Sequence, residues 1–147
     1  MRRALLSWSL VWVVACAKSE VPPAMEAPAA PTIDLASLAG TWAAAATPQG
    51  SDSVVIRYTV NVSADPTGWT SVLPGRDPMS LTVKVSGDSI LTQSPPFESV
   101  ARPGVQVSSS GYLRLVDGKL TGPMYVRSAT GDSVSVVNLW TTLTRVE

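Results

Sequence analysis

Hydrophobic and polar residues alternate along most of the chain after residue 33, and alternation with a period of two is typical of half-buried β-strands. The pattern is clearest at residues 54–62 and 79–85, where large apolar side chains occupy every second position. Shorter stretches predict further strands at residues 41–46, 69–73, 89–94, 105–108, 112–116, 119–128 and 133–145. Only residues 35–38 favour a helical turn, with Asp34 as the N-cap and Gly40 just past its end.

Two-residue turns indicate how neighbouring strands pair. Gly-Asp at 87–88, Asp-Gly at 117–118 and Gly-Asp at 131–132 each separate two alternating stretches, and such dipeptides favour tight β-hairpins. The registers that these turns set keep apolar residues on one face, with three pairs expected: Val85 with Ile90, Leu115 with Leu120, and Val126 with Val137. We therefore predict an all-β fold, an antiparallel up-and-down meander that closes into a small barrel of about eight or nine strands, with a β-sandwich as the alternative.

The N-terminal residues have the features of an export signal. Two arginines at positions 2 and 3 precede an apolar stretch at 4–15, which is shorter than the roughly 20 residues that span a bilayer. The stretch ends in Val-Val-Ala-Cys at 13–16, which resembles the lipobox of bacterial lipoproteins. This resemblance implies a signal peptide at residues 1–15, cleavage between Ala15 and Cys16, and attachment of palmitate-type acyl chains to Cys16.

The lipobox also implies a location and a domain organisation. A lipidated Cys16 would anchor the protein to a membrane of the bacterial cell envelope, and to the outer membrane in a Gram-negative host because no Asp follows Cys16. Cys16 is the single cysteine, so no disulfide can form within the chain. Residues 16–32 are rich in proline and alanine and predict a tether that extends to roughly 50 Å at about 3.1 Å per residue. Residues 33–147 are left to form one β-domain.

The two ends of this domain resemble those of lipocalins. Gly40-Thr41-Trp42 is similar to the Gly-x-Trp motif that opens the first strand of that family, and Arg145 stands where the family places an arginine near the end of its last strand. The resemblance implies a structural plug in which Arg145 packs across the ring of Trp42 and Gly40 precedes it. The middle of the chain lacks the Thr-Asp-Tyr segment of the family, so there the resemblance rests on the strand pattern alone.

The composition excludes most catalytic schemes. The chain has no histidine, which removes Ser-His-Asp and Cys-His nucleophiles and most zinc sites. Gly-Asp-Ser-Ile at 87–90 is similar to the nucleophile block of the Gly-Asp-Ser-Leu hydrolases, but those enzymes need a histidine, and Gly-Asp-Ser recurs at 131–133 in another turn. We therefore expect no enzyme, no catalytic residue, no cofactor and no metal. Without the two arginines of the signal peptide, 9 basic and 11 acidic residues give a net charge of 9 − 11 = −2. The basic residues are scattered, so nucleic acid is not expected as a partner.

The resemblance to lipocalins implies a binding function at the envelope. We expect a small apolar or amphiphilic ligand inside the barrel, and the aromatic candidates for its cavity are Tyr58, Trp69, Tyr112 and Tyr125, which otherwise belong to the core or the surface. The alternative is a non-catalytic structural or interaction protein whose barrel is solid and binds no small molecule.

The last strand carries an apolar stripe on its outer side. With Val126 opposite Val137, the side chains of Val134, Val136 and Trp140 point away from the core. We expect a partner to cover this stripe: a second copy of the chain, another envelope protein or the proline-rich tether. The alternative is a β-bulge near residues 136–137 that turns both ends of the strand inward.

Overall fold

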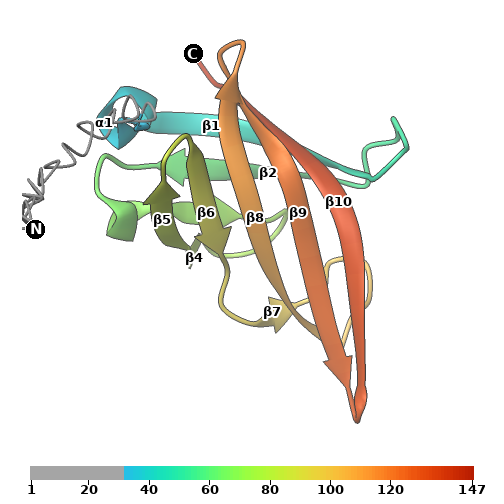
Figure 1. Cartoon of the computed structure of the whole chain (residues 1–147). Coiled ribbons are helices and arrows are strands. Elements are labelled where there is room, and N and C mark those ends of the chain that lie inside the picture. Colours follow the sequence, from blue (N-terminus) through green and yellow to red (C-terminus); the bar gives the residue numbers. More distant parts are fainter. Residues whose placement is uncertain (1–31) are drawn as a thin grey trace, which may run out of the picture.

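The computed structural model describes residues 32–147 (Figure 1). The predicted signal peptide, the cleavage site at Ala15 and Cys16, and the tether up to residue 31 lie outside the described residues. The described chain contains ten strands, one α-helical turn and one 3-10 turn, which confirms the all-β prediction. Their bounds are α1 Leu35–Leu38, β1 Gly40–Pro48, β2 Ile56–Val62, η1 Pro66–Gly68, β3 Thr70–Val72, β4 Met79–Ser80, β5 Thr82–Ser86, β6 Ser89–Gln93, β7 Phe97–Glu98, β8 Gln106–Val116, β9 Lys119–Thr130 and β10 Ser133–Arg145.

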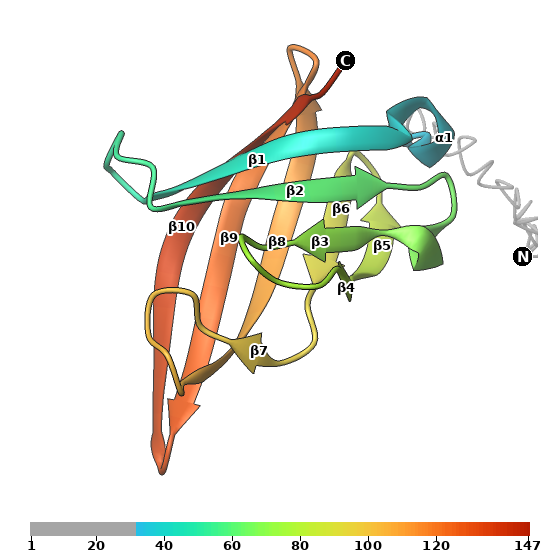
Figure 2. The same cartoon turned by 180° about the vertical axis from the view of Figure 1, so that it is seen from behind.

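Nine of these strands form one continuous antiparallel meander, in the order β4-β3-β2-β1-β10-β9-β8-β6-β5, and β7 pairs with β8 off this path. The sheet wraps around on itself, as the two opposite views show (Figures 1 and 2). The ends of the path, β4 and β5, are joined in the chain by Leu81, whose N–H donates to the carbonyl of Trp69 at 2.9 Å. The meander therefore makes a nearly closed barrel as predicted, and the β-sandwich alternative is wrong because all strands belong to one sheet.

The three tight hairpins have the predicted registers. The observed pairs include Val85 with Ile90, Leu115 with Leu120, and Val126 with Val137. In the β8–β9 turn, Asp117 and Gly118 have φ values of 51° and 75°, as a type I′ turn requires at both central positions. Sequence reasoning works well here because the turn chemistry and the apolar alternation specify the same register.

Several strands differ from the prediction. Residues 79–85 were expected as one strand but form two, β4 and β5, which lie at opposite ends of the sheet. Residues 105–108 and 112–116 were expected as two strands, but β8 runs unbroken because its run of three serines and Gly111 pairs with β9, and Ser110 and Gly111 also pair with β6. The strand expected from residue 54 begins only at Ile56, since residues 54 and 55 belong to the β1–β2 connection. The short strand β7 was not predicted, because two residues carry no periodicity.

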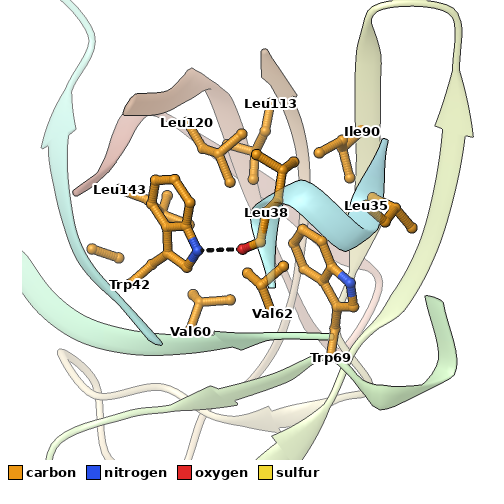
Figure 3. Packing of buried hydrophobic residues seen from close by; sticks show 11 residues of the cluster. Leu35, Leu38, Trp42, Val60, Val62, Trp69, Ile90, Leu113, Leu120 and Leu143 are labelled. Carbon is orange, nitrogen blue, oxygen red and sulfur yellow. Dashed lines mark hydrogen bonds between the residues drawn. The ribbon is translucent and has the colours of Figure 1, made fainter. Parts of the chain in front are cut away.

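One end of the barrel is filled by a packed apolar cluster (Figure 3). The helical turn α1 begins as predicted, with Asp34 accepting the N–H of Ala36 at 3.0 Å, and it covers this end with two buried leucines. Trp69 is fully buried beside it and donates its indole N–H to the carbonyl of Ser63 at 3.0 Å. The cluster consists of Leu35, Leu38, Trp42, Ala44, Val60, Val62, Trp69, Ile90, Leu113, Leu120 and Leu143.

The last strand keeps one register along its length. Pairing with β9 runs without interruption from Ser133 to Leu143, so the alternative of a β-bulge is wrong. Val134, Val136 and Trp140 are all exposed on the outer side, as the register predicts. Among residues 32–147, no helix has both the length and the apolar character needed to cross a bilayer.

Candidate ligand cavity

The other half of the barrel is hollow. A cavity of about 510 Å³ lies between the packed cluster and the loops at the opposite end. Cavities that bind small molecules measure roughly 300–1,000 Å³. Its lining comes from β2, β3, β8, β9, β10 and the loop between β6 and β8, and includes Ile56, Tyr58, Val60, Leu73, Phe97, Val107, Leu113, Met124, Val126, Leu139 and Leu143.

Small side chains on the inner face explain why this level of the barrel is not filled. The inner face of β8 carries Ser109 and Gly111 between two larger residues, and β3 contributes Ser71. On β1, the small buried residue beside this level is Ala46, which pairs with the cavity residue Ile56. Large side chains at such positions would meet across the interior of a small barrel, as they do at the packed end. Small inward side chains therefore leave space in the middle of the barrel, although inward and outward positions still alternate along each strand.

Tyr58 places a polar group inside this apolar space. Its hydroxyl lies 3.0 Å from Oγ1 of Thr141 and 3.7 Å from the sulfur of Met124. Either hydroxyl can donate in the Tyr58–Thr141 hydrogen bond, and Oγ1 of Thr141 also lies 3.4 Å from the carbonyl oxygen of Ala45. Burial raises the pKa of Tyr58 above its ordinary value, although the hydrogen bond to Thr141 partly opposes the shift. The neutral phenol thus keeps a lone pair that can accept a hydrogen bond from a ligand.

The β6–β8 loop, residues 94–105, closes one side of the cavity. Its two ends are fixed to the barrel: the N–H of Ser109 donates to Oγ of Ser94 at 2.8 Å, and β7 pairs with the start of β8. Arg76 from the β3–β4 connection donates to the carbonyls of Glu98 and Ser99. These contacts hold Phe97 and its neighbours against the interior.

The mouth of the cavity combines apolar residues with one cation. Val55, Val100 and Val137 line the cavity and are nevertheless exposed, so the rim presents apolar surface to water. Arg102 is the one charged side chain among the lining residues, and its guanidinium donates to Oγ of Ser128 at 3.2 Å. An apolar interior with a tyrosine hydroxyl inside and a guanidinium at the rim suits an apolar or amphiphilic molecule.

The structure brings together the three residues that the lipocalin resemblance singled out. Trp42 and Arg145 are direct partners in the β1–β10 pairing, and the guanidinium carbon lies 5.3 Å from the ring centroid of Trp42. The same guanidinium donates to the carbonyls of Ser37 and Ala39 at 3.2 and 2.6 Å. A Cβ on Gly40 would stand 3.6 Å from it. Ala15 and Cys16 belong to the part of the chain that the structure does not describe.

The four aromatic candidates separate into different environments. Tyr58 lines the cavity, whereas Trp69 belongs to the packed end. Tyr112 and Tyr125 are exposed on the outside of the barrel. Sequence reasoning missed the β6–β8 loop and the small residues at mid-height. The only sequence signal for the cavity is the set of serines, glycine and alanine at inward positions, which is recognisable only once the register is known.

The Gly-Asp-Ser motif at 87–89 belongs to a turn in the structure. The hydroxyl of Ser89 donates to Asp88 at 3.0 Å and accepts from Arg114 at 3.1 Å, and Arg114 also lies 3.6 Å from Asp88. This exposed group stabilises the β5–β6 turn. Within residues 32–147, no cluster of His, Cys, Asp or Glu has the composition to hold a metal ion.

Comparison with known proteins adds no family to these observations. No protein-family model, no curated protein and no solved structure matches this chain. Inference about function therefore rests on the barrel, its cavity and the sequence motifs.

Proposed function

We propose that this protein is a lipid-anchored lipoprotein of the bacterial cell envelope whose barrel binds a small apolar or amphiphilic ligand. The observation that carries the binding function is the cavity of about 510 Å³, which is apolar apart from a few placed polar groups. The lipobox-like residues at 13–16 support the anchor. A barrel filled by side chains, the alternative for a purely structural protein, would not need the small residues that leave this space open.

The polar groups indicate how such a ligand would be oriented. An apolar body would occupy the space between Leu139, Val126 and Val107, where it displaces water from apolar walls. A hydrogen-bond donor on the ligand would meet the hydroxyl of Tyr58, and a polar or acidic head would reach Arg102 at the rim. Exposed valines at the mouth would be covered by the same molecule.

Filling the cavity is expected to abolish binding of an apolar probe. In Val126→Trp, the larger ring enters the cavity from β9, so the Kd for a fluorescent fatty-acid analogue should rise at least about tenfold, the effect of losing roughly 1.4 kcal/mol. Titration of the purified protein with the probe measures this change. The matched control is Tyr125→Trp, one residue earlier on the same strand and on the outer face, which should leave the Kd unchanged.

Two results would argue against the cavity as the binding site. Equal weakening by Val126→Trp and Tyr125→Trp would place the probe on the surface. Absence of binding to the unchanged protein, together with no small molecule released when the native protein is extracted with organic solvent, would favour the solid-barrel interaction protein instead.

The anchor is tested at Cys16. Cys16→Ser removes the thiol that would carry the acyl chains, so we expect the protein to leave the membrane fraction and the N-terminal peptide to lose the mass of its lipid. Fractionation and mass spectrometry of the native protein measure both. An unmodified Cys16 in protein recovered from the envelope would contradict lipidation without bearing on the cavity.

A further inference from the structure

The outer face of β8, β9 and β10 presents exposed aromatic rings. Tyr112 is 47% exposed, Tyr125 is 37% exposed and Trp140 is 43% exposed, one from each of the three strands. The two tyrosine rings meet edge to face at an angle of 81°, with centroids 6.4 Å apart. They form one wall of a shallow groove of about 630 Å³ that also contacts Val136. We call this surface the aromatic face.

The indole of Trp140 is hydrogen-bonded to the neighbouring strand. Its indole N–H donates to Oγ1 of Thr121 on β9 at 2.8 Å, and Pro123 is its direct partner across the β9–β10 pairing. The hydrogen bond ties the indole to the neighbouring strand and leaves the side chain partly exposed. An exposed ring that is fixed in this way suits a ligand that stacks on aromatic rings, such as a proline ring.

The groove of the aromatic face carries one charged side chain, Arg127, which makes no ion pair with another described residue. Arg114 lies beyond Tyr112 on the same side of β8, where it is 3.6 Å from Asp88. The carboxylates of residues 32–147 lie in turns, loops, α1's cap and β7, so none belongs to the outer face of these three strands. A partner for this face is expected to be acidic and to offer apolar groups for stacking.

We propose that the proline-rich segment of this same chain, residues 17–31, docks on the aromatic face. The segment reads AKSEVPPAMEAPAAP and holds four prolines, two glutamates and one lysine. Proline-rich segments favour the extended polyproline conformation, which docks into grooves lined by aromatic residues at a low cost in entropy. The two acidic side chains, Glu20 and Glu26, would complement the unpaired Arg127.

The described chain begins close to this face. The N–H of Ile33 donates to the carbonyl of Gly87 at 3.2 Å, and the next residue, Asp88, contacts Arg114 on β8. Pro22 and Pro23 stand about ten residues before this point, a reach of roughly 30 Å at about 3.1 Å per residue. The strands β8, β9 and β10 measure roughly 40 Å at about 3.3 Å per residue, so the segment is long enough to extend over most of this face. Covalent attachment also gives it a high effective concentration at the face.

The same observations disfavour a second copy on this face. Two copies that paired through the groove would bring their Arg127 side chains together, with no carboxylate among the groove residues to offset them. The proline-rich segment has a net charge of 1 − 2 = −1 and is therefore complementary.

Site-specific photo-crosslinking in cells tests the proposal on the full chain. With p-benzoylphenylalanine in place of Tyr125, we expect the main product to be a monomer whose crosslinked peptide comes from residues 17–31, as identified by mass spectrometry. The control places the same probe at Arg57, an exposed position on β2, where no crosslink to that segment is expected. Combining the Tyr125 probe with Glu20→Lys and Glu26→Lys should lower the yield by roughly threefold, because exposed ion pairs contribute modestly.

Each outcome decides the proposal. A crosslink from position 125 to residues 17–31 that is absent from position 57 supports it. Crosslinked dimers, a phospholipid adduct, a product with another envelope protein, or equal yields at both positions would each overturn it. If the protein with the probe at Tyr125 does not accumulate, the probe at Tyr112, across the same groove, gives the same reading.

Discussion

Trp42→Ala is expected to lower the free energy of unfolding by about 3–5 kcal/mol, the usual loss for a buried aromatic. Trp42 is only 2% exposed in the packed end of the barrel (Figure 3). Its indole N–H donates to the carbonyl of Leu38 at 2.9 Å, so truncation also leaves that carbonyl without its partner. Urea unfolding followed by circular dichroism measures the loss. The matched control is Trp140→Ala on the exposed aromatic face, which should cost about 1 kcal/mol or less.

Coupling between Trp42 and Arg145 is the second part of this prediction. Arg145→Ala should also destabilise the protein, because it removes the guanidinium from the ring and from the carbonyls at the end of α1. In the double variant the two losses should fall short of additivity by about 0.5–2 kcal/mol, since the residues are in contact. Strict additivity would show that the cation–π contact contributes nothing to the stability of the closed end.

Gly122→Ala is expected to destabilise the barrel by about 3 kcal/mol or more, at the upper limit of overpacking. A Cβ on Gly122 would overlap the backbone carbonyl of Tyr112 on the neighbouring strand. The β8–β9 pairing has the same register on both sides of this point but makes no bridge at Tyr112 and Leu113, where Pro123 lacks an N–H. The strands β8 and β9 must move apart to admit the methyl group, because a backbone carbonyl cannot change rotamer as a side chain can.

Gly111→Ala provides the control for this prediction. It introduces the same methyl group into the buried middle of β8, but there the nearest atom is Oγ1 of Thr92, a side chain that can change rotamer, at 3.0 Å. The expected loss is about 1 kcal/mol. Urea unfolding of both variants measures the difference, and similar losses for the two would contradict the proposed backbone collision at Gly122.

The part of the fold that sequence predicted is the part with strong local chemistry. The Gly-Asp and Asp-Gly turns, together with apolar alternation, specified three hairpins and placed Val136 and Trp140 outside. The all-β class followed from the same alternation. Asp34 identified the start of α1 because an N-cap acts through its own backbone neighbours.

Most of the cavity lining could not be predicted because it depends on contacts between distant segments. Ser109 and Gly111 resemble loop residues in the sequence, yet they lie in the middle of β8. There, pairing with the neighbouring strands holds them in the sheet despite their weak preference for β-structure. The β6–β8 loop reaches the interior only through Arg76, a residue from a different connection. By contrast, the tyrosines of the aromatic face meet because β8 and β9 form the hairpin that the Asp-Gly turn at 117–118 predicts.

The pairing of β1 with β10 has a consequence for how the chain reaches this structure. Every other neighbouring pair on the path joins strands that are close in sequence, whereas the contact between Arg145 and Ala39 spans 106 residues. Ring closure must therefore wait until the whole intervening chain has been synthesised, and long-range pairing of this kind is the slow step of β-rich folding. Until then β1 and β10 each present a free backbone edge. The nascent chain is thus most prone to aggregate through the two strands whose union later completes the barrel.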